Sequence, residues 1–186
     1  MDRQRLLTLL EMAMMAALAV VFSQIKVFEM PQGGSVSLVM VPIALIAVRR
    51  GVVAGIVTGT IVGLLQLMLG STIVDPIQLL LDYPLAFAAL GLSGLIRLSG
   101  YEGKKQRIMV LWSSLFIGVI GRFMCHFISG IVWFGHYTPE GTPVAWYSFV
   151  YNITYLLPEM IISGVVLTVV LGSASSLLFP ARDRLA

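Results

Sequence analysis

The chain of 186 residues is 58% hydrophobic and only 11% charged, with 12 basic and 9 acidic residues and a formal net charge of +3. Soluble domains carry about 25% charged residues, so this composition excludes a water-soluble fold and predicts an integral membrane protein. A single cysteine, Cys125, excludes an internal disulfide, and two histidines exclude a Cys/His zinc cluster. The basic residues lie at the ends of apolar segments and form no aromatic-interleaved patch, so we expect no nucleic-acid partner. We also expect no metal or cofactor.

Six apolar runs follow one another along the chain, separated by charged or Gly/Pro-containing breaks. A membrane-crossing helix needs about 20 residues, so the chain has room for six crossings and for no soluble domain beside them. The sequence therefore predicts an all-α fold, a polytopic membrane bundle of six transmembrane helices that forms one domain over residues 1–186. The runs are residues 6–27, 36–48, 52–69, 77–98, 108–134 and 144–179.

The first run has some features of a secretory signal peptide, because Arg3 and Arg5 precede it and residues 17–19 have a small-x-small form. Glu11 interrupts its apolar part, however, and cleavage would leave only five spans. We expect an uncleaved first helix.

The second and sixth runs differ from the others in length. The second is short for a crossing, so residues 30–35 are expected to complete the membrane thickness as irregular chain, buried against protein or lining a cavity. The sixth is too long for one straight crossing, and its membrane part is placed at residues 147–171 with a kink at Pro158. Residues 173–186 are expected to leave along the inner surface.

Ten of the twelve basic residues fall at chain positions that share one side of the membrane if the chain crosses six times. Basic residues accumulate on the cytoplasmic side, so both termini are expected to be cytoplasmic and the connections after runs one, three and five to face outward. Only Lys26 and Arg122 fall elsewhere. The ten are Arg3, Arg5, Arg49, Arg50, Arg97, Lys104, Lys105, Arg107, Arg182 and Arg184.

Three polar residues in different runs share one depth when residues are counted inward from the outer ends: Asp82, His126 and Asn152. Ionisable residues within membrane spans usually line a cavity or pathway, so we expect a polar pocket that opens outward and has aromatic walls. Tyr83, Tyr151 and Ser129 lie at the same level, and Trp133, Trp146 and Tyr147 lie nearer the mouth.

Each of these residues also has a structural interpretation. The aromatic residues near the outer ends, including Tyr137, could form a membrane-interface belt, and Asn152 or His126 could serve as an interhelical hydrogen-bond partner. Arg122 and Glu159 lie one turn deeper, and we expect them to form a structural ion pair. That pairing leaves Asp82 to meet a cationic ligand, with an Asp82–Arg122 pair as the alternative.

Small residues recur at four-residue spacing in two runs, a spacing that lets helix backbones approach closely. Gly51, Gly55, Gly59 and Gly63 are expected to pack inside the protein. Ala13 and Ala17, in the first run, are expected to form a face that docks a partner protein.

Several mechanisms lack their sequence motifs. No phosphate-binding loop, His-Glu-x-x-His or Gly-x-Ser-x-Gly motif is present, and no internal duplication of the kind found in inverted-repeat carriers is visible. An enzyme that uses His126 and Glu159 as acid and base is disfavoured, because the two lie at different depths.

Six segments resemble the thiamin-specific substrate-binding component of energy-coupling-factor transporters. They are residues 5–8, 34–42, 49–51, 78–87, 122–130 and 151–152. The resemblance implies a multi-pass protein of the bacterial cell membrane with six helices and cytoplasmic termini. It also implies that the protein binds a vitamin from outside without altering it, and docks through alanines of its first helix onto a membrane coupling subunit that carries two ATPases.

The resemblance assigns ligand contacts to six residues, and the depth count also selects all of them except Gly130. They are Asp82, Tyr83, His126, Gly130, Tyr147 and Asn152. Residues 28–35 lack the tryptophan expected as a lid, so Phe28 is the candidate substitute.

Thiamin joins a permanently cationic thiazolium to an aminopyrimidine. We expect the protein to bind it with nanomolar affinity. In this assignment Asp82 supplies the charge, and His126 and Asn152 supply hydrogen bonds. Trp133, Tyr83 and Tyr147 supply aromatic faces, with Tyr151 beside them. Riboflavin or biotin is the alternative ligand, disfavoured because neither carries a fixed positive charge.

Overall fold

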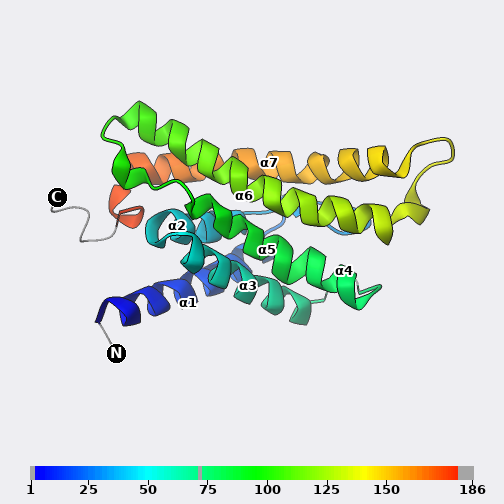
Figure 1. The fold of residues 1–186 in the computed structure, drawn as a ribbon, viewed down its shortest axis with the longest axis horizontal. Helices are drawn as coiled ribbons and strands as arrows, with labels where there is room; N and C mark the ends of the chain where they lie inside the picture. Colours follow the sequence, from blue (N-terminus) through cyan, green and yellow to red (C-terminus); the bar gives the residue numbers. More distant parts are fainter. Residues whose placement is uncertain (1–2, 71–72, 180–186) are drawn as a thin grey trace.

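Residues 3–70 and 73–179 are described by the computed structural model, and they form an all-α helix bundle with one small β-hairpin (Figure 1). The main elements are α1 (Arg3–Gln24), β1 (Phe28–Glu29), β2 (Ser35–Val36), α2 (Met40–Arg50), α3 (Val52–Met68), α4 (Pro76–Leu80), α5 (Ala86–Ala89), α6 (Lys104–Val132) and α7 (Val144–Ser173). A π-helical turn, η1 (Leu81–Leu85), joins α4 to α5, and the 3₁₀ turns are η2 (Leu90–Gly94), η3 (Leu98–Gly100), η4 (Gly135–Tyr137) and η5 (Ser175–Leu177).

Each of the six predicted apolar runs contains helix, but the helices differ in length. Four helical stretches are long and apolar enough to cross a membrane: Arg3–Gln24, Pro76–Gly100, Lys104–Val132 and Val144–Ser173. α3 is a shorter apolar helix, and the 11 residues of α2 span only about 16 Å at 1.5 Å per residue. The protein is a membrane helix bundle, and the count of six crossings stays a prediction.

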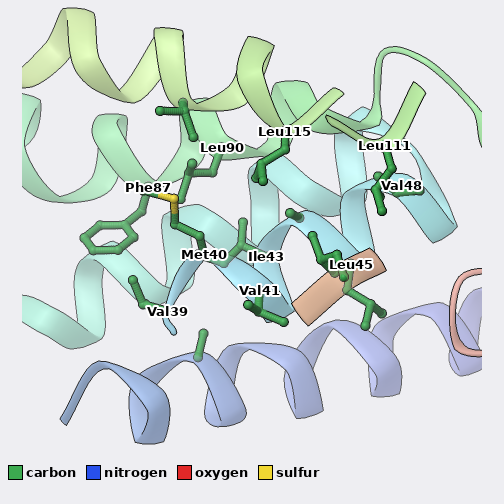
Figure 2. Close-up of a cluster of buried hydrophobic side chains, with 14 of the residues drawn as sticks. Val39, Met40, Val41, Ile43, Leu45, Val48, Phe87, Leu90, Leu111 and Leu115 are labelled. Atoms are coloured by element: carbon green, nitrogen blue, oxygen red, sulfur yellow. The ribbon is translucent and has the colours of Figure 1, made fainter. Parts of the chain in front are cut away.

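α2 lies in the core of the bundle. Every residue from Met40 to Val48 is buried. Figure 2 shows Ile43 and Leu45 of this helix packed among apolar side chains that include Leu90 and Leu115 from neighbouring elements. A helix that is apolar on all sides is stable only when it is surrounded, and here protein surrounds it.

The glycines of α3 allow that helix to touch the backbone of the segment from η1 to η2. A Cβ added at Gly59 would overlap the carbonyl oxygen of Phe87, and a Cβ at Gly55 or Gly63 would also lie within 3 Å of backbone atoms of the same segment. The prediction of internal packing is confirmed for these three residues. Gly51 has a different role, because with a φ of 93° it ends α2 and starts the turn into α3.

The connection between α1 and α2 is an ordered hairpin. Of residues 30–35, which the sequence predicted as irregular chain, residues 30–34 form its turn and Ser35 begins β2. Phe28 pairs with Val36 and Glu29 with Ser35 in antiparallel register, and β2 packs against α7. The turn uses Gly33 and Gly34 at φ of 94° and 91°, values that residues with a side chain rarely adopt. Backbone groups that irregular chain would leave unpaired are therefore bonded across the two strands.

α7 continues through Pro158 as one helix, and η5 follows it. Residues 180–186, which include Arg182 and Arg184, lie outside the described residues.

One end of the bundle gathers the start of α1, the start of α6 and the end of α7 (Figure 1). There Glu11 of α1 accepts hydrogen bonds from both Arg49 (3.0 Å) and Arg50 (2.6 Å and 2.7 Å) at the end of α2. Arg49 also donates to three carbonyl groups after α7, those of Ser176, Leu177 and Phe179. This charged cluster, called the basic end below, ties three helix ends together.

Candidate ligand-binding cavity

A cavity of about 270 Å³ lies toward the end of the bundle opposite the basic end. Its lining comes from the end of α1, the hairpin, the end of α3, the segment from α4 to α5, the second half of α6 and the first half of α7. Segments far apart in the sequence therefore meet around one space. Polar and aromatic side chains dominate its wall.

Asp82 lies in the wall of this cavity, on the π-helical turn η1. Pro84 within the turn has no N–H to donate to the helix, and wide turns of this kind occur frequently at functional sites. Three donors hold the carboxylate. His126 Nδ1 lies 3.0 Å from Oδ1, while Gln78 Nε2 and Ser129 Oγ each lie 2.7 Å from Oδ2.

Arg122 and Glu159 lie beneath Asp82 and His126. Arg122 Nη1 is 3.1 Å from Glu159 Oε2, and the side chains are 7% and 0% exposed respectively. Ser37, which follows β2, donates to the other carboxylate oxygen of Glu159 at 2.9 Å. The guanidinium also lies over the ring of Phe87, with 4.6 Å from its central carbon to the ring centroid.

The predicted alternative, a pair between Asp82 and Arg122, is not formed among the described residues. Arg122 contacts Glu159 and also donates from Nε to His126 Nε2 at 3.3 Å. The imidazole thus lies between the guanidinium and Asp82.

Aromatic rings form much of the remaining wall. Tyr147 and Tyr151 lie 5.9 Å apart between ring centroids, and Tyr151 and Tyr155 lie 6.3 Å apart, so three tyrosines follow one face of α7. The Tyr151 hydroxyl accepts a hydrogen bond from the Gln32 amide and donates one to the Gly33 carbonyl, both at 2.9 Å. The predicted contact residue Tyr151 therefore also fastens the hairpin turn to α7.

Asn152 lines the cavity, and both the nitrogen and the oxygen of its side-chain amide form hydrogen bonds. Nδ2 donates to the Ser148 carbonyl at 2.9 Å, and Oδ1 accepts from the Tyr155 hydroxyl at 2.8 Å. Gly130 of α6 faces the same place, because a Cβ there would overlap Ser148 Oγ. The glycine lets α6 and α7 approach closely beside the cavity.

Two sequence predictions differ from the structure. Trp133 is not among the residues that line the cavity, whereas Phe134 is. Continued helical rotation would have placed Trp133 on the face of His126 and Gly130, but α6 ends at Val132 and the chain turns there. Phe28 does not line the cavity either, and its side chain is exposed on β1.

The sequence analysis did not identify two residues that donate hydrogen bonds to Asp82 and Glu159, namely Gln78 and Ser37. Gln78 could have been found, because it lies four residues before Asp82 and therefore on the same helical face. Ser37 offered no signal, since its partner Glu159 is 122 positions away.

The predicted docking residues lie on the outer face of α1. Ala13 and Ala17 are exposed, while Ala16 and Ala19 of the same helix are buried in the bundle. The four alanines thus divide between an outward and an inward face.

Comparison with known proteins gives the family. Residues 9–179 match the model of the family described as thiamine transporter protein. The chain belongs to this family. The match covers all the helices that surround the cavity, and the resemblance seen in the sequence is confirmed.

Two curated relatives match nearly the whole length of the chain. A thiamine transporter ThiT of Bacillus subtilis is 44% identical over 183 residues, covering 94% of this chain and 95% of the relative. One from Lacticaseibacillus paracasei is 32% identical over 191 residues, covering 98% and 94%. A solved structure of ThiT from Listeria monocytogenes superposes with a TM-score of 0.89 at 31% identity, covering 96% of this chain and all of that one.

These findings assign the chain to multi-pass bacterial membrane transporters and exclude the enzyme interpretation. In the structure Arg122 lies between His126 and Glu159 and donates hydrogen bonds to both.

Proposed function

We propose that this protein binds thiamin in the cavity beside Asp82 and takes it up as the substrate-specific subunit of an ATP-driven energy-coupling-factor transporter. One observation carries the proposal: a carboxylate with no Lys or Arg partner among the described residues faces a cavity with aromatic walls. The names of the curated relatives support the choice of ligand.

The chemistry of thiamin matches this wall. Its thiazolium is a permanent cation, which Asp82 attracts most strongly where water is excluded. Tyr83 and Tyr147 offer aromatic faces to the rings. Asn152 Oδ1 is the candidate for a hydrogen bond to the aminopyrimidine, and Gly130 keeps the wall close without filling the space. His126 can offer this ring only its face, because Asp82 and Arg122 engage both of its nitrogens. We expect nanomolar affinity, a binding free energy of about −12 kcal/mol.

A direct test compares ligands of different charge on the purified protein. Thiamin is expected to bind at nanomolar concentration, while riboflavin and biotin, which lack the fixed cation, are expected to bind far more weakly. Mass spectrometry of small molecules released on denaturation gives an independent identification. Micromolar or absent thiamin binding, or release of another vitamin, would contradict the proposal.

The proposed orientation places the basic end in the cytoplasm and the cavity toward the outside. Arg3, Arg5, Arg49, Arg50 and Lys104 lie at helix ends on one side of the bundle, as cytoplasmic basic residues do. This arrangement supports the prediction of six crossings with both termini in the cytoplasm.

Transport requires energy that this chain has no motif to release, since it contains no phosphate-binding loop. We propose that the exposed Ala13 and Ala17 face of α1 docks onto a membrane coupling subunit that carries two ATPase subunits. Small residues allow the close helix contact that such docking needs.

Replacing Ala17 with Trp tests the docking face. Ala17→Trp is expected to retain thiamin binding, because Ala17 is exposed on the outer face of α1 and does not line the cavity, and to abolish uptake in vesicles that contain the ATPase partners. Val165→Trp places the same side chain on an exposed apolar face of α7 and serves as the control. Equal uptake by the two variants would remove the docking role from α1.

A further inference from the structure

The two ring nitrogens of His126 face groups of opposite charge. Nδ1 lies 3.0 Å from Asp82 Oδ1, and Nε2 lies 3.3 Å from Arg122 Nε. A guanidinium can only donate hydrogen bonds, so Nε2 must act as the acceptor. The ring proton therefore lies on Nδ1, where it is donated to Asp82.

A second proton on His126 would disturb this arrangement. An imidazolium carries N–H groups at both nitrogens, and its Nε2–H would point at the Nε–H of Arg122. A positive charge would also lie directly beside the guanidinium. Arg122 thus opposes the one protonation state of His126 that would neutralise Asp82.

Glu159 completes the arrangement by balancing the charge of Arg122. Its side chain is fully buried, and its oxygens accept from Arg122 Nη1 and Ser37 Oγ. With Arg122 and Glu159 cancelling and His126 neutral, this group of four side chains keeps a single negative charge, at Asp82. One negative charge complements one monovalent cation.

We propose that Arg122 is a positioning residue for ligand binding, which acts through His126 to keep Asp82 charged and available to a cationic ligand. This inference takes its ligand, thiamin, from the proposed function. The hydrogen bonds that link Asp82, His126, Arg122 and Glu159 do not depend on that proposal. Arg122 needs no contact with thiamin to have this effect.

Among the residues that the structure describes, the surroundings of His126 contain no other group that ordinarily titrates between pH 5 and 8. η1 contributes Asp82, α6 itself contributes Arg122 and Cys125, and α7 contributes Tyr155 and Glu159. A change in binding across this pH range can therefore be traced to the imidazole.

The first test needs no ligand. Nitrogen-15 NMR of histidine-labelled protein, with His136→Gln to assign the two signals, reports which ring nitrogen carries the proton. The wild type is expected to show the neutral Nδ1–H form of His126 from pH 8 to pH 5.5. An Nε2–H tautomer, or an imidazolium at pH 6, would overturn the proposal even if every Arg122 variant failed to fold.

The second test uses the double variant Arg122→Gln/Glu159→Gln, which removes both charges of the buried pair together. Released from Arg122, His126 is expected to gain a proton and pair with Asp82 as the pH falls. A histidine of ordinary pKa, about 6.5, would weaken thiamin binding about tenfold between pH 8 and pH 5.5 in the double variant, against less than about twofold in the wild type. Adding His126→Gln to the double variant should abolish this pH dependence.

A neutral thiamin isostere, with a thiophene ring in place of the thiazolium, distinguishes charge from shape. Its affinity for the double variant is expected to change less than about twofold over the same pH range, because it does not depend on a charged Asp82. Equal pH ratios for the two ligands, or for wild type and double variant, would overturn the positioning role. Failure of the wild type to bind thiamin at any pH would contradict the proposed function, and the NMR result would still decide the role of Arg122.

Discussion

The two charged clusters of this protein are built from similar residues and do different things. At the basic end, Glu11 meets Arg49 and Arg50, and side-chain exposures of 25%, 14% and 14% leave the group in contact with its surroundings. Beside the cavity, Arg122 and Glu159 are almost fully enclosed. The partly exposed cluster joins α1 to the end of α2, whereas the enclosed one is proposed to control the charge of Asp82.

The two clusters differ in their net charge. The basic end has a net charge of +1, from Arg49, Arg50 and Glu11, which agrees with its proposed cytoplasmic location. The cavity cluster, which consists of Asp82, His126, Arg122 and Glu159, has a net charge of −1, located at Asp82. A charge within a membrane span is energetically costly and usually has a functional role. In the proposed function, the cationic ligand balances the negative charge of Asp82.

The largest expected effect comes from breaking the enclosed pair. Glu159→Leu leaves Arg122 buried without its partner and is expected to lower the free energy of unfolding by about 3 to 5 kcal/mol. Glu11→Leu breaks the partly exposed cluster and is expected to cost about 1 kcal/mol or less. Denaturation of both variants in the same detergent measures the contrast. Equal losses of unfolding free energy in the two variants would show that burial does not make the Arg122–Glu159 pair more important for stability than the basic end.

The next effect concerns binding. Asp82→Asn keeps the shape of the side chain and removes its charge, so thiamin affinity is expected to fall by about 2 to 3 kcal/mol, or about 30- to 150-fold. Asp75→Asn, the same change at the N-cap of α4, is the control, because asparagine also caps helices well. Titration of purified protein measures both. Similar affinities for wild type and Asp82→Asn would place the cation elsewhere.

Packing around the cavity gives the third effect. Gly59→Ala forces α3 away from the carbonyl of Phe87 and is expected to lower stability by about 1 to 3 kcal/mol. Gly172→Ala, near the end of α7, meets no atom within 4 Å and is expected to be neutral or slightly stabilising. Thermal unfolding in detergent compares the two. A tolerated Gly59→Ala would mean that α3 does not depend on this close approach.

The smallest effect is expected at the hairpin. Tyr151→Phe removes the hydroxyl that joins the turn to α7, and a hydrogen bond contributes about 0.5 to 1.5 kcal/mol. Hydrogen exchange at the Gln32 amide should become faster, and thiamin should dissociate a few times faster. Tyr101→Phe, at the basic end, should change neither rate. Unchanged exchange in Tyr151→Phe would show that the turn is held by other contacts.

The sequence by itself determined the membrane class, the positions of the apolar helices and the depth of the polar residues. Hydropathy and helical rise are local properties, so counting residues places Asp82, His126 and Asn152 at one level without knowledge of their neighbours. The same count put Arg122 level with Glu159, and the two side chains lie 3.1 Å apart. The strict spacing of Gly55, Gly59 and Gly63 likewise indicated a packed face of α3.

Only the tertiary structure decided which of these groups contact one another and which aromatic residues face the cavity. The end of α6 at Val132 brings Phe134 into the wall and leaves Trp133 outside it. The hairpin supplies Ser37 to Glu159 across 122 positions. Contacts of this kind depend on where helices end and how they rotate against each other, which packing settles and a one-dimensional pattern does not record.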